Sequence, residues 1–285
     1  RRWKVLNKLL APHMWLWMMT GTPAAQSPVD AFGLAKLVNP NSVPRFFSSF
    51  RDMVMQKVTN FKWVPKENAT DTVFKALQPA IRFTKEECLD LPDMVYVKRT
   101  VEMTRQQKKY YKQLKDTMVM QAAGEQITAA NAAVNMNKLL QISSGAVYTD
   151  DGDSLEFDIK HRYKVLREVI DESTKKVLVF VPFKHVIDIL TGKLINDGIP
   201  TEVIRGDVSA SKRTDIFKRF QTNAAPQVLV IQPAAAAHGV TLTAANTVVW
   251  WGPTSSLETY AQANARVHRS GPVSYTHLTL PTSHN

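Results

Sequence analysis

A glutamine and two arginines near the carboxyl end of the chain have the types and the spacing for phosphate chemistry. Gln262, Arg266 and Arg269 follow one another at intervals of four and three residues in the segment QANARVHR. On a helix these intervals place all three side chains on one face. Guanidinium groups are planar and always charged, so they match the negative charge that spreads over a phosphoryl group in transfer. The pattern predicts an arginine pair that faces phosphate, and its alternative is two solvated arginines on a surface helix.

A second group of cations lies in the middle of the chain. They recur at positions i, i+3, i+4 and i+7 of a predicted long helix: Arg105, Lys108, Lys109 and Lys112. An apolar stripe runs beside them, so this helix has one basic face and one packed face. The basic face is either a surface that follows phosphates or an ordinary solvated face.

Short apolar strands alternate with amphipathic helices from about residue 158 onward. The predicted strands are Val177–Val181, Thr201–Ile204, Val228–Ile231 and Val248–Trp251. Strands that are apolar throughout and separated by helices indicate an α/β fold, with a parallel sheet covered by helices on both faces. Right-handed crossovers bring the loops after these strands to one edge, where such proteins bind ligands. The residues expected at that edge are Lys184, Gly206, the segment Gln232–Gly239 and Gly252.

The amino-terminal segment predicts one more strand. Met14–Met19 is an apolar run that ends in the turn Thr20–Pro23. A strand that runs into a loop of small residues is again a place where α/β proteins bind ligands. Helical patterns follow around Phe46–Phe50 and Val73–Leu77.

Charge and cysteine content narrow the class of protein. The 285 residues include 36 lysines and arginines against 25 aspartates and glutamates, so the net charge is +11. Such a surface favours polyanions, nucleic acid first among them. The single cysteine, Cys88, cannot form an internal disulfide and no Cys/His spacing resembles a zinc site, so we expect no structural metal and a reducing, cytoplasmic compartment. No apolar run approaches the roughly 18 residues of a membrane-spanning helix, so we expect no membrane partner.

Several loosely specific motifs stand in the order typical of one family of motor proteins. In chain order they are Thr20–Pro23, Val177–Phe183, Gly206 with Arg213 and Phe220, Gly239–Asn246, and Gln262–Arg269. In this order, and over nearly the whole chain to about Gly271, the sequence resembles the superfamily-two helicase-like ATPases. Within them it is similar to the Swi/Snf-type DNA translocases and their phage relatives.

The resemblance implies a RecA-like carboxyl-terminal lobe and a role for each motif. Arg266 and Arg269 would be arginine fingers that complete an ATP site, while Gln262 and Gly239 would contact the nucleotide. The residues that would contact the DNA backbone, through hydroxyls, amides or charge, are Thr20, Thr22, Lys184, Gly206, Thr241 and Thr243. The implied partner is double-stranded DNA, bound with little preference for sequence, in a bacterium or a phage-infected cell.

The family's phosphate loop is not found in this sequence. The only Gly-Lys pair, Gly192-Lys193, lacks the upstream glycine and is followed by Leu194. No acidic box for Mg²⁺ stands in the family's order, and Ala236-Ala237 replaces the paired glycines that the family usually has in the motif of Gly239–Asn246. We therefore expect ATP and Mg²⁺ to be held mainly by a first lobe encoded upstream, and this chain to be inactive by itself. A catalytically silent nucleic-acid-binding or scaffolding module is the alternative.

The motifs divide the chain into four segments. Residues 1–85 resemble the end of the first RecA-like lobe, residues 86–150 are predicted to be a helical insertion, and residues 151–272 resemble the second lobe. Residues 273–285 continue no pattern of the family and resemble translated sequencing-adapter sequence. We expect this last segment to be artefactual or disordered.

Overall fold

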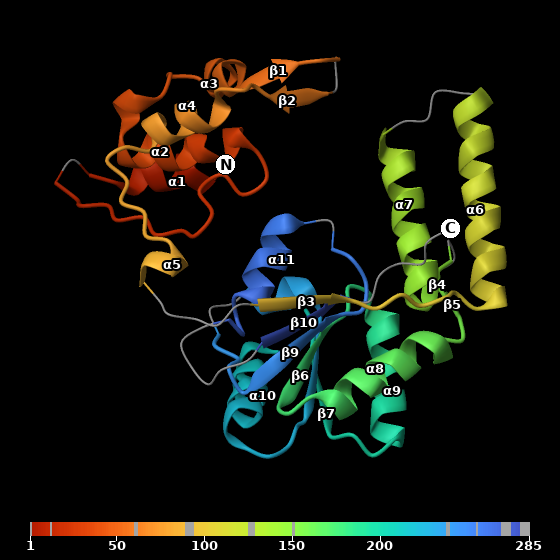
Figure 1. The fold of residues 1–285 in the computed structure, drawn as a ribbon. Helices are drawn as coiled ribbons and strands as arrows, with labels where there is room; N and C mark the ends of the chain where they lie inside the picture. Colours follow the sequence, from red (N-terminus) through yellow and green to blue (C-terminus); the bar gives the residue numbers. More distant parts are fainter. Residues whose placement is uncertain are drawn as a thin grey trace. The chain divides into compact units, whose positions relative to one another are not determined.

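The computed structural model describes most of the chain. The described residues are 2–11, 13–59, 62–88, 94–124, 129–149, 152–237, 240–254, 256–268 and 275–279. They belong to two compact units, residues 1–88 with 256–258 and residues 89–255 with 259–285 (Figure 1).

The first unit is built from short helices and one β-hairpin. Its helices are α1 (Arg2–Leu9), α2 (Ala31–Val38), α3 (Phe47–Val54), α4 (Ala69–Ala76) and α5 (Lys85–Cys88), with 3-10 turns at Pro28–Asp30 and Pro40–Ser42. The hairpin pairs β1 (Met55–Lys57) with β2 (Trp63–Pro65). Phe32 lies at the centre of the core, with its ring 5.5 Å from the rings of Trp3 and Phe50.

The strand predicted at Met14–Met19 is wrong, because these residues take no strand conformation. No described residue pairs with this segment. Its alternate side chains Trp15, Trp17 and Met19 are 91%, 86% and 97% exposed. An apolar strand is stabilised by neighbours on its edges and faces, which composition alone does not supply.

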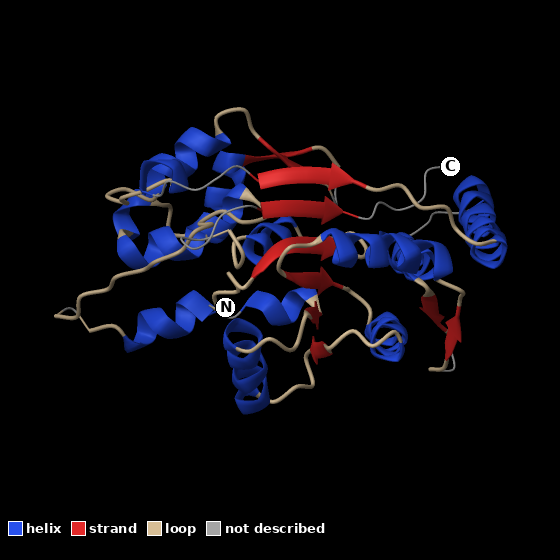
Figure 2. Ribbon diagram, turned by 60° about the horizontal axis from the view of Figure 1, so that its bottom comes forward, coloured by secondary structure: helices blue, strands red, loops and turns tan. Residues whose placement is uncertain are grey.

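A parallel sheet forms the centre of the second unit (Figure 2). Its strands are β3 (Met94–Lys98), β6 (Lys176–Phe180), β7 (Thr201–Ile204), β8 (Val228–Ile231), β9 (Ala245–Trp250) and β10 (Tyr275–Thr279). Their order is β3-β10-β9-β6-β8-β7, and each pairing is parallel. The predicted α/β class is confirmed, and the four predicted strands are β6 to β9.

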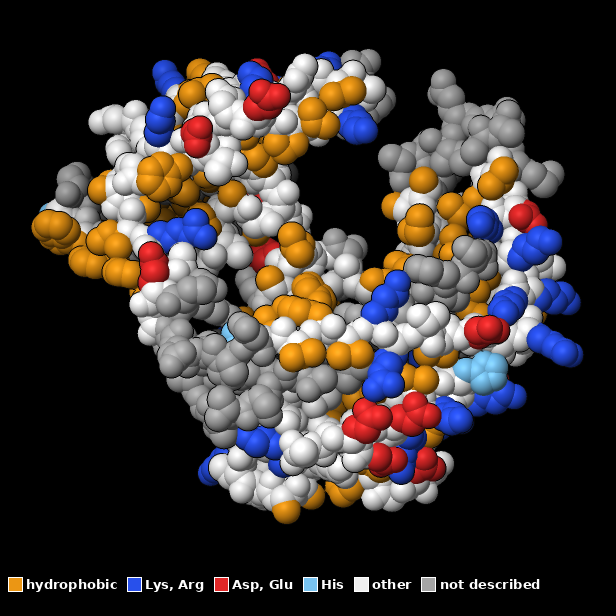
Figure 3. All heavy atoms as spheres, viewed as in Figure 1, with side chains coloured by type: hydrophobic (Ala, Val, Ile, Leu, Met, Phe, Trp, Pro, Cys, Tyr) orange, Lys and Arg blue, Asp and Glu red, His pale blue; other side chains and the backbone are white. Residues whose placement is uncertain are grey.

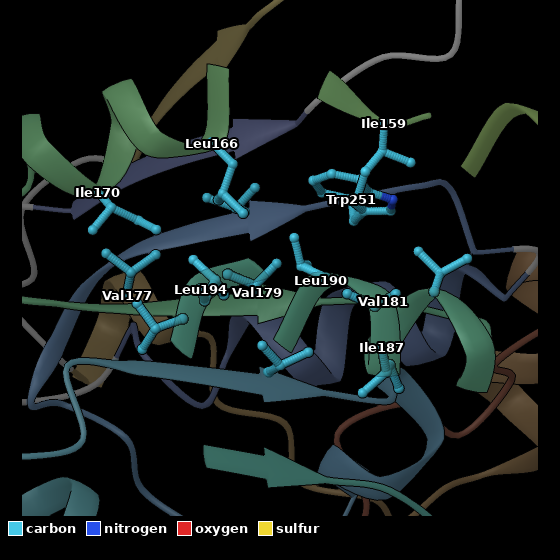
Figure 4. Packing of buried hydrophobic residues seen from close by; sticks show 14 of the residues in the cluster. Ile159, Leu166, Ile170, Val177, Val179, Val181, Ile187, Leu190, Leu194 and Trp251 are labelled. Atoms are coloured by element: carbon cyan, nitrogen blue, oxygen red, sulfur yellow. The ribbon is translucent and has the colours of Figure 1, made fainter. Parts of the chain in front are cut away.

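Helices cover the sheet on both faces because successive strand residues point to opposite sides. Val177, Val179 and Val181 face α8 (Lys160–Glu172) and α9 (Lys184–Asn196), as Figure 4 shows. Leu178 and Phe180 face α10 (Ala210–Thr222) and α11 (Leu257–Asn264). All five side chains are fully buried, which explains why the strand reads as a continuous apolar run.

A helical hairpin lies between β3 and β6 in the chain. Its arms are α6 (Arg105–Gly124) and α7 (Ala129–Ser144), as the helical pattern predicts. Its base is the antiparallel pair β4 (Ala146–Tyr148) and β5 (Ser154–Glu156). Gly152, with a φ of +89°, lies in the turn between these two strands.

Two strands of the sheet were not expected from the sequence. β3 lies at the edge of the sheet, and β10 pairs with both β3 and β9. β10 comes from the segment predicted to be an artefactual or disordered tail. Its five residues, YTHLT, include aromatic and β-branched types that favour strands. The other residues of that segment, 273–274 and 280–285, lie outside the described part of the chain.

Candidate functional site

The carboxyl ends of β6 to β9 meet at one edge of the sheet. Hydrogen bonds continue from strand to strand just past these ends: Val181 N–H to Ile231 O (3.0 Å), Gln232 N–H to Ile204 O (2.8 Å) and Trp251 N–H to Phe180 O (2.9 Å). These hydrogen bonds therefore fix the backbone positions from which the following loops begin. The sequence predicted this shared edge.

The loop after β7 is bonded to the end of β8. Gly206 donates its N–H to Gln232 Oε1 at 3.3 Å. A Cβ at Gly206 would meet that oxygen at 3.8 Å, an ordinary contact, and the φ of Gly206 lies outside the left-handed region. A phosphate that bound the Gly206 amide would therefore take the place of Gln232 Oε1.

Two cations at this edge are paired with carboxylates. Arg205 contacts Asp188 (2.6 Å) and Asp207 (2.9 Å), and Lys184 Nζ lies 3.8 Å from Asp207 Oδ2. Burial lowers the pKa of Arg205, but the two carboxylates raise it above the ordinary value. Lys184, the first residue of α9, is about half exposed (51%), so a phosphate can reach it in exchange for Asp207.

The loop before β9 is hydrogen-bonded to α10. Leu242 is fully buried, whereas Thr241 before it is exposed. Gln221 of α10 accepts the N–H of Ala244 at 2.9 Å and donates to Thr243 Oγ1 at 3.4 Å. Gln221 thus holds the loop at both Thr243 and Ala244. Gly239 lies outside the described residues.

The arginine-bearing segment does not continue as the predicted helix. α11 ends at Asn264, and Arg266 donates its N–H to Ala263 O (3.1 Å) in a tighter turn. Gln262 therefore lies on the helix and Arg266 lies beyond its end, both half-buried. The single helical face expected for the three residues is wrong for Arg266, and Arg269 lies outside the described residues.

Two contacts explain why the helix stops there. Trp250 Nε1 at the end of β9 donates to Asn264 Oδ1 at 2.9 Å, and both residues are buried. Leu242 N–H donates to Arg266 O at 2.9 Å. Val267 packs in the same apolar cluster as Leu242 and Trp250. This backbone hydrogen bond joins the Gly239–Asn246 motif directly to the Gln262–Arg269 motif.

The opposite face of the sheet carries a second buried junction. Trp251 Nε1 donates to Ser144 O at the end of α7 (2.8 Å), and Arg162 Nη1 of α8 donates to Trp251 O (2.5 Å). Burial lowers the pKa of Arg162 to about 10. A Cβ on Gly252 would come within 3.1 Å of Ser144 Oγ, so glycine permits this close approach. The junction ties the helical hairpin to the end of β9.

Sequence reasoning missed the residues that hold these loops, namely Ser144, Arg162, Gln221 and Asn264. A signal existed for Arg162, which stands four residues before Leu166 on the apolar stripe of α8. Gln221 and Asn264 carry no such signal, because their partners are distant in sequence.

The threonine turn belongs to the first unit. Thr22 donates its N–H to Thr20 Oγ1 at 3.1 Å. Thr20 is exposed and Thr22 is half-buried. Nothing lies within 4 Å of a Cβ built on Gly21, so the turn is open around its glycine.

The described residues gather no group of three or more His, Cys, Asp or Glu side chains that could hold a metal ion. None of the helices in the described ranges has the length and apolar character needed to cross a membrane.

Two family models match the chain. The SNF2-related domain matches residues 1–147, and the helicase conserved C-terminal domain matches residues 161–271.

Curated relatives match almost the full chain at low identity. An ATP-dependent helicase of Mycoplasma genitalium is 26% identical over 89% of the chain, and a SWI/SNF-related regulator of chromatin, subfamily A-like protein 1, of Xenopus tropicalis is 25% identical over 96%. The chain spans 24% and 28% of their lengths. Protein p41 of Acyrthosiphon pisum secondary endosymbiont phage 1 is 24% identical over 95% of the chain, which spans 58% of it.

Solved structures share the fold. The SWI2/SNF2 ATPase core of Sulfolobus solfataricus in complex with dsDNA has a TM-score of 0.53 at 22% identity, covering 92% of this chain and 56% of that one. The C-terminal part of the Fun30 ATPase domain has a TM-score of 0.53 at 15% identity, covering 67% and 86%.

Proposed function

The chain belongs to the SNF2-related, Swi/Snf-type family of helicases, and from this premise we propose that it is the carboxyl-terminal part of an ATP-dependent double-stranded-DNA translocase. Residues 1–85 would end the first lobe, residues 86–150 form the helical insertion, and residues 151–272 form the second lobe. The place of action would be the cytoplasm of a bacterium or a phage-infected cell, in keeping with the phage relative.

The hydrogen bond between Leu242 and Arg266 carries the proposal. It couples the loop proposed to contact DNA to the segment proposed to contact ATP, at the carboxyl edge of a parallel sheet. Under this proposal a displacement of one segment would be transmitted to the other through this backbone contact. A translocase needs such a link, because its affinity for DNA must change with the state of the bound nucleotide.

On the nucleotide side, Arg266 and Arg269 would stabilise the charge that develops on a transferred phosphoryl group, and Gln262 and Gly239 would position the nucleotide. ATP bound with Mg²⁺ supplies the free energy for movement. The sequence contains no phosphate loop of the family's form, and the proposal is that a first lobe holds both mainly.

On the DNA side, hydroxyls, amides and one ammonium would contact phosphates. The proposed residues are Thr20, Thr22, Lys184, Gly206, Thr241 and Thr243. Contacts of this kind position a protein on the duplex without reading bases. Binding should therefore tolerate changes of sequence and weaken steeply with salt.

The test is ATP turnover by the complete protein with and without duplex DNA. Arg269→Ala and Arg266→Ala should each lower DNA-stimulated turnover by about a hundredfold or more, because an arginine finger contributes about 10³ to 10⁵ in rate. Nucleotide affinity should change little. Arg167→Ala on α8, which removes a partly exposed arginine paired with Asp171, is the matched control and should keep normal turnover.

Unchanged turnover in both finger variants would overturn the assignment of the arginines. A complete protein that binds duplex DNA but never hydrolyses ATP would instead favour a catalytically silent binding module.

A further inference from the structure

The outer side of α6 carries five cations that the proposed site does not use. We name Arg105, Lys108, Lys109, Lys112 and Lys115 the α6 basic face; all five are exposed. Among the described residues only Lys108 has an ion-pair partner, the exposed carboxylate of Glu102 at 3.2 Å. Lys and Arg side chains gather along α6 in Figure 3. One acid, Asp116, lies on the same helix.

Buried contacts at the base of α6 fix which way this face points. Gln107 is 5% exposed and donates to Ile142 O of α7 at 2.9 Å. Its Oε1 accepts the N–H of Thr104 at 3.0 Å, and Thr104 Oγ1 accepts the N–H of Gln107, which together form a capping box. Because Gln107 points at α7, Arg105, Lys109 and Lys112 point to the far side of α6, and Lys108 and Lys115 lie on its flank.

The spacing of these cations suits a regular row of phosphates. From Arg105 to Lys115 the helix rises about 15 Å, at about 1.5 Å per residue. One strand of B-DNA presents a phosphate about every 3.4 Å along its axis, so about four lie within this span. Lysines on long flexible stems can follow such a row without a fixed geometry.

The charge of the whole hairpin is one-sided. Residues 105–144 contain six lysines and arginines and two acids, so they carry four of the net positive charges of the chain. A face that only needs to be solvated commonly mixes both signs, because i, i+4 pairs of opposite charge stabilise a helix. Like charges at i, i+3 and i+4 instead repel one another, and this repulsion is relieved when a polyanion binds.

We propose that the α6 basic face binds the phosphate backbone of duplex DNA, as a contact outside the site at the sheet edge. The inference rests on the proposed function for the presence of the duplex. It adds a second surface, on the helical hairpin, through which the chain holds its DNA.

The experiment compares two matched pairs of lysines in the 285-residue chain. Lys108→Ala/Lys112→Ala changes the α6 basic face. Lys160→Ala/Lys164→Ala changes an i, i+4 pair of exposed lysines on α8, and Lys160 is paired with Asp158 at 3.4 Å much as Lys108 is paired with Glu102. Alanine keeps both helices, which circular dichroism checks. Binding to a labelled 30-base-pair duplex is measured across a range of salt concentrations.

The α6 pair should reduce the slope of log K against log salt by about 2, close to one unit for each phosphate contact, and weaken binding several-fold. The α8 pair should leave the slope unchanged. Equal losses in both pairs would mean a general effect of net charge and would overturn the proposal, as would no loss in either pair. Loss of binding to polyglutamate with unchanged binding to duplex would also overturn it, in favour of an acidic protein partner.

Failure of the proposed function gives a different result. In that case the unaltered chain shows no salt-dependent binding to duplex, whereas failure of the α6 contact alone leaves the unaltered chain binding normally.

Discussion

At the scale of single residues, the hydrogen bond between Trp250 and Asn264 fixes the end of α11, from which the arginine-bearing turn begins. Both partners are buried, so neither can exchange its bond for one with water. The position of Arg266 therefore depends on Asn264, whose side chain has a structural role in the hydrogen bond with Trp250.

Asn264→Leu should lower the free energy of unfolding by about 1 to 3 kcal/mol, because it leaves the Trp250 N–H buried without an acceptor. Urea unfolding measures this loss. The exposed Asn137 of α7 provides the control, since Asn137→Leu should change stability by less than about 0.5 kcal/mol. Equal effects of the two substitutions would show that the hydrogen bond does not stabilise the turn.

Asp158 makes part of the stability depend on pH. Its Oδ1 accepts the N–H of Lys160 at 2.9 Å, and this backbone hydrogen bond is the main cause that lowers the pKa of Asp158. A lowered pKa stabilises the fold above the unfolded value of about 3.9, and that stabilisation is lost as the pH falls through the folded value.

Asp158→Ala should therefore cost up to about 1 kcal/mol at pH 7, a small figure because the carboxylate is largely exposed. The difference from the unaltered chain should shrink as the pH falls toward 3. Urea unfolding at both pH values measures it, and a difference that does not change with pH would show that the charged carboxylate is not the stabilising group.

At the scale of elements, α7, α8 and β9 meet where Gly252 passes Ser144. The Ser144 hydroxyl is buried and has no hydrogen-bond partner within the described residues. Its removal should therefore cost little, while it also makes room beside Gly252.

Gly252→Ala should destabilise the chain by about 1 kcal/mol through overpacking. In a Ser144→Ala background the same change should cost less, with a coupling of about 0.5 to 1 kcal/mol in a double-mutant cycle. Free energies of unfolding of the four proteins give the coupling. If the effects of the two substitutions on the free energy of unfolding simply add, the Ser144 hydroxyl does not clash with a methyl group at position 252.

The strands and helices of the second unit differ in how well the sequence predicted them. β6 to β9 were predictable because a strand buried on both faces is apolar at every position, as Val177–Val181 is. β3 was missed although Met94–Val97 is an apolar run, because its partner strand β10 is distant in sequence. The end of α11 was missed for another reason. Helical spacing describes one element, but the helix stops where Trp250 and Leu242, residues of other elements, bind its last turns.

At the scale of the whole molecule, a contiguous apolar segment is left in solvent at Met14–Met19. Such patches promote association between copies. Trp15→Thr, Trp17→Thr and Met19→Thr together should reduce self-association of the 285-residue chain, as measured by sedimentation velocity.

The control replaces exposed apolar side chains that are not contiguous, by Phe46→Thr, Phe74→Thr and Ile81→Thr, which are 62%, 63% and 82% exposed in the unaltered chain. This control should associate as the unaltered chain does. Equal reductions would show that total exposed apolar area matters, and not the segment.

β9 ends at Trp250, and the next residue, Trp251, packs on the opposite face of the sheet. Trp250 holds the arginine-bearing turn, and Trp251 holds the helical hairpin. Because side chains of a strand alternate, one residue inserted or deleted within Ala245–Trp250 would exchange the two indoles and release both anchors together. Related genes should therefore tolerate substitutions in this strand far better than changes in its length.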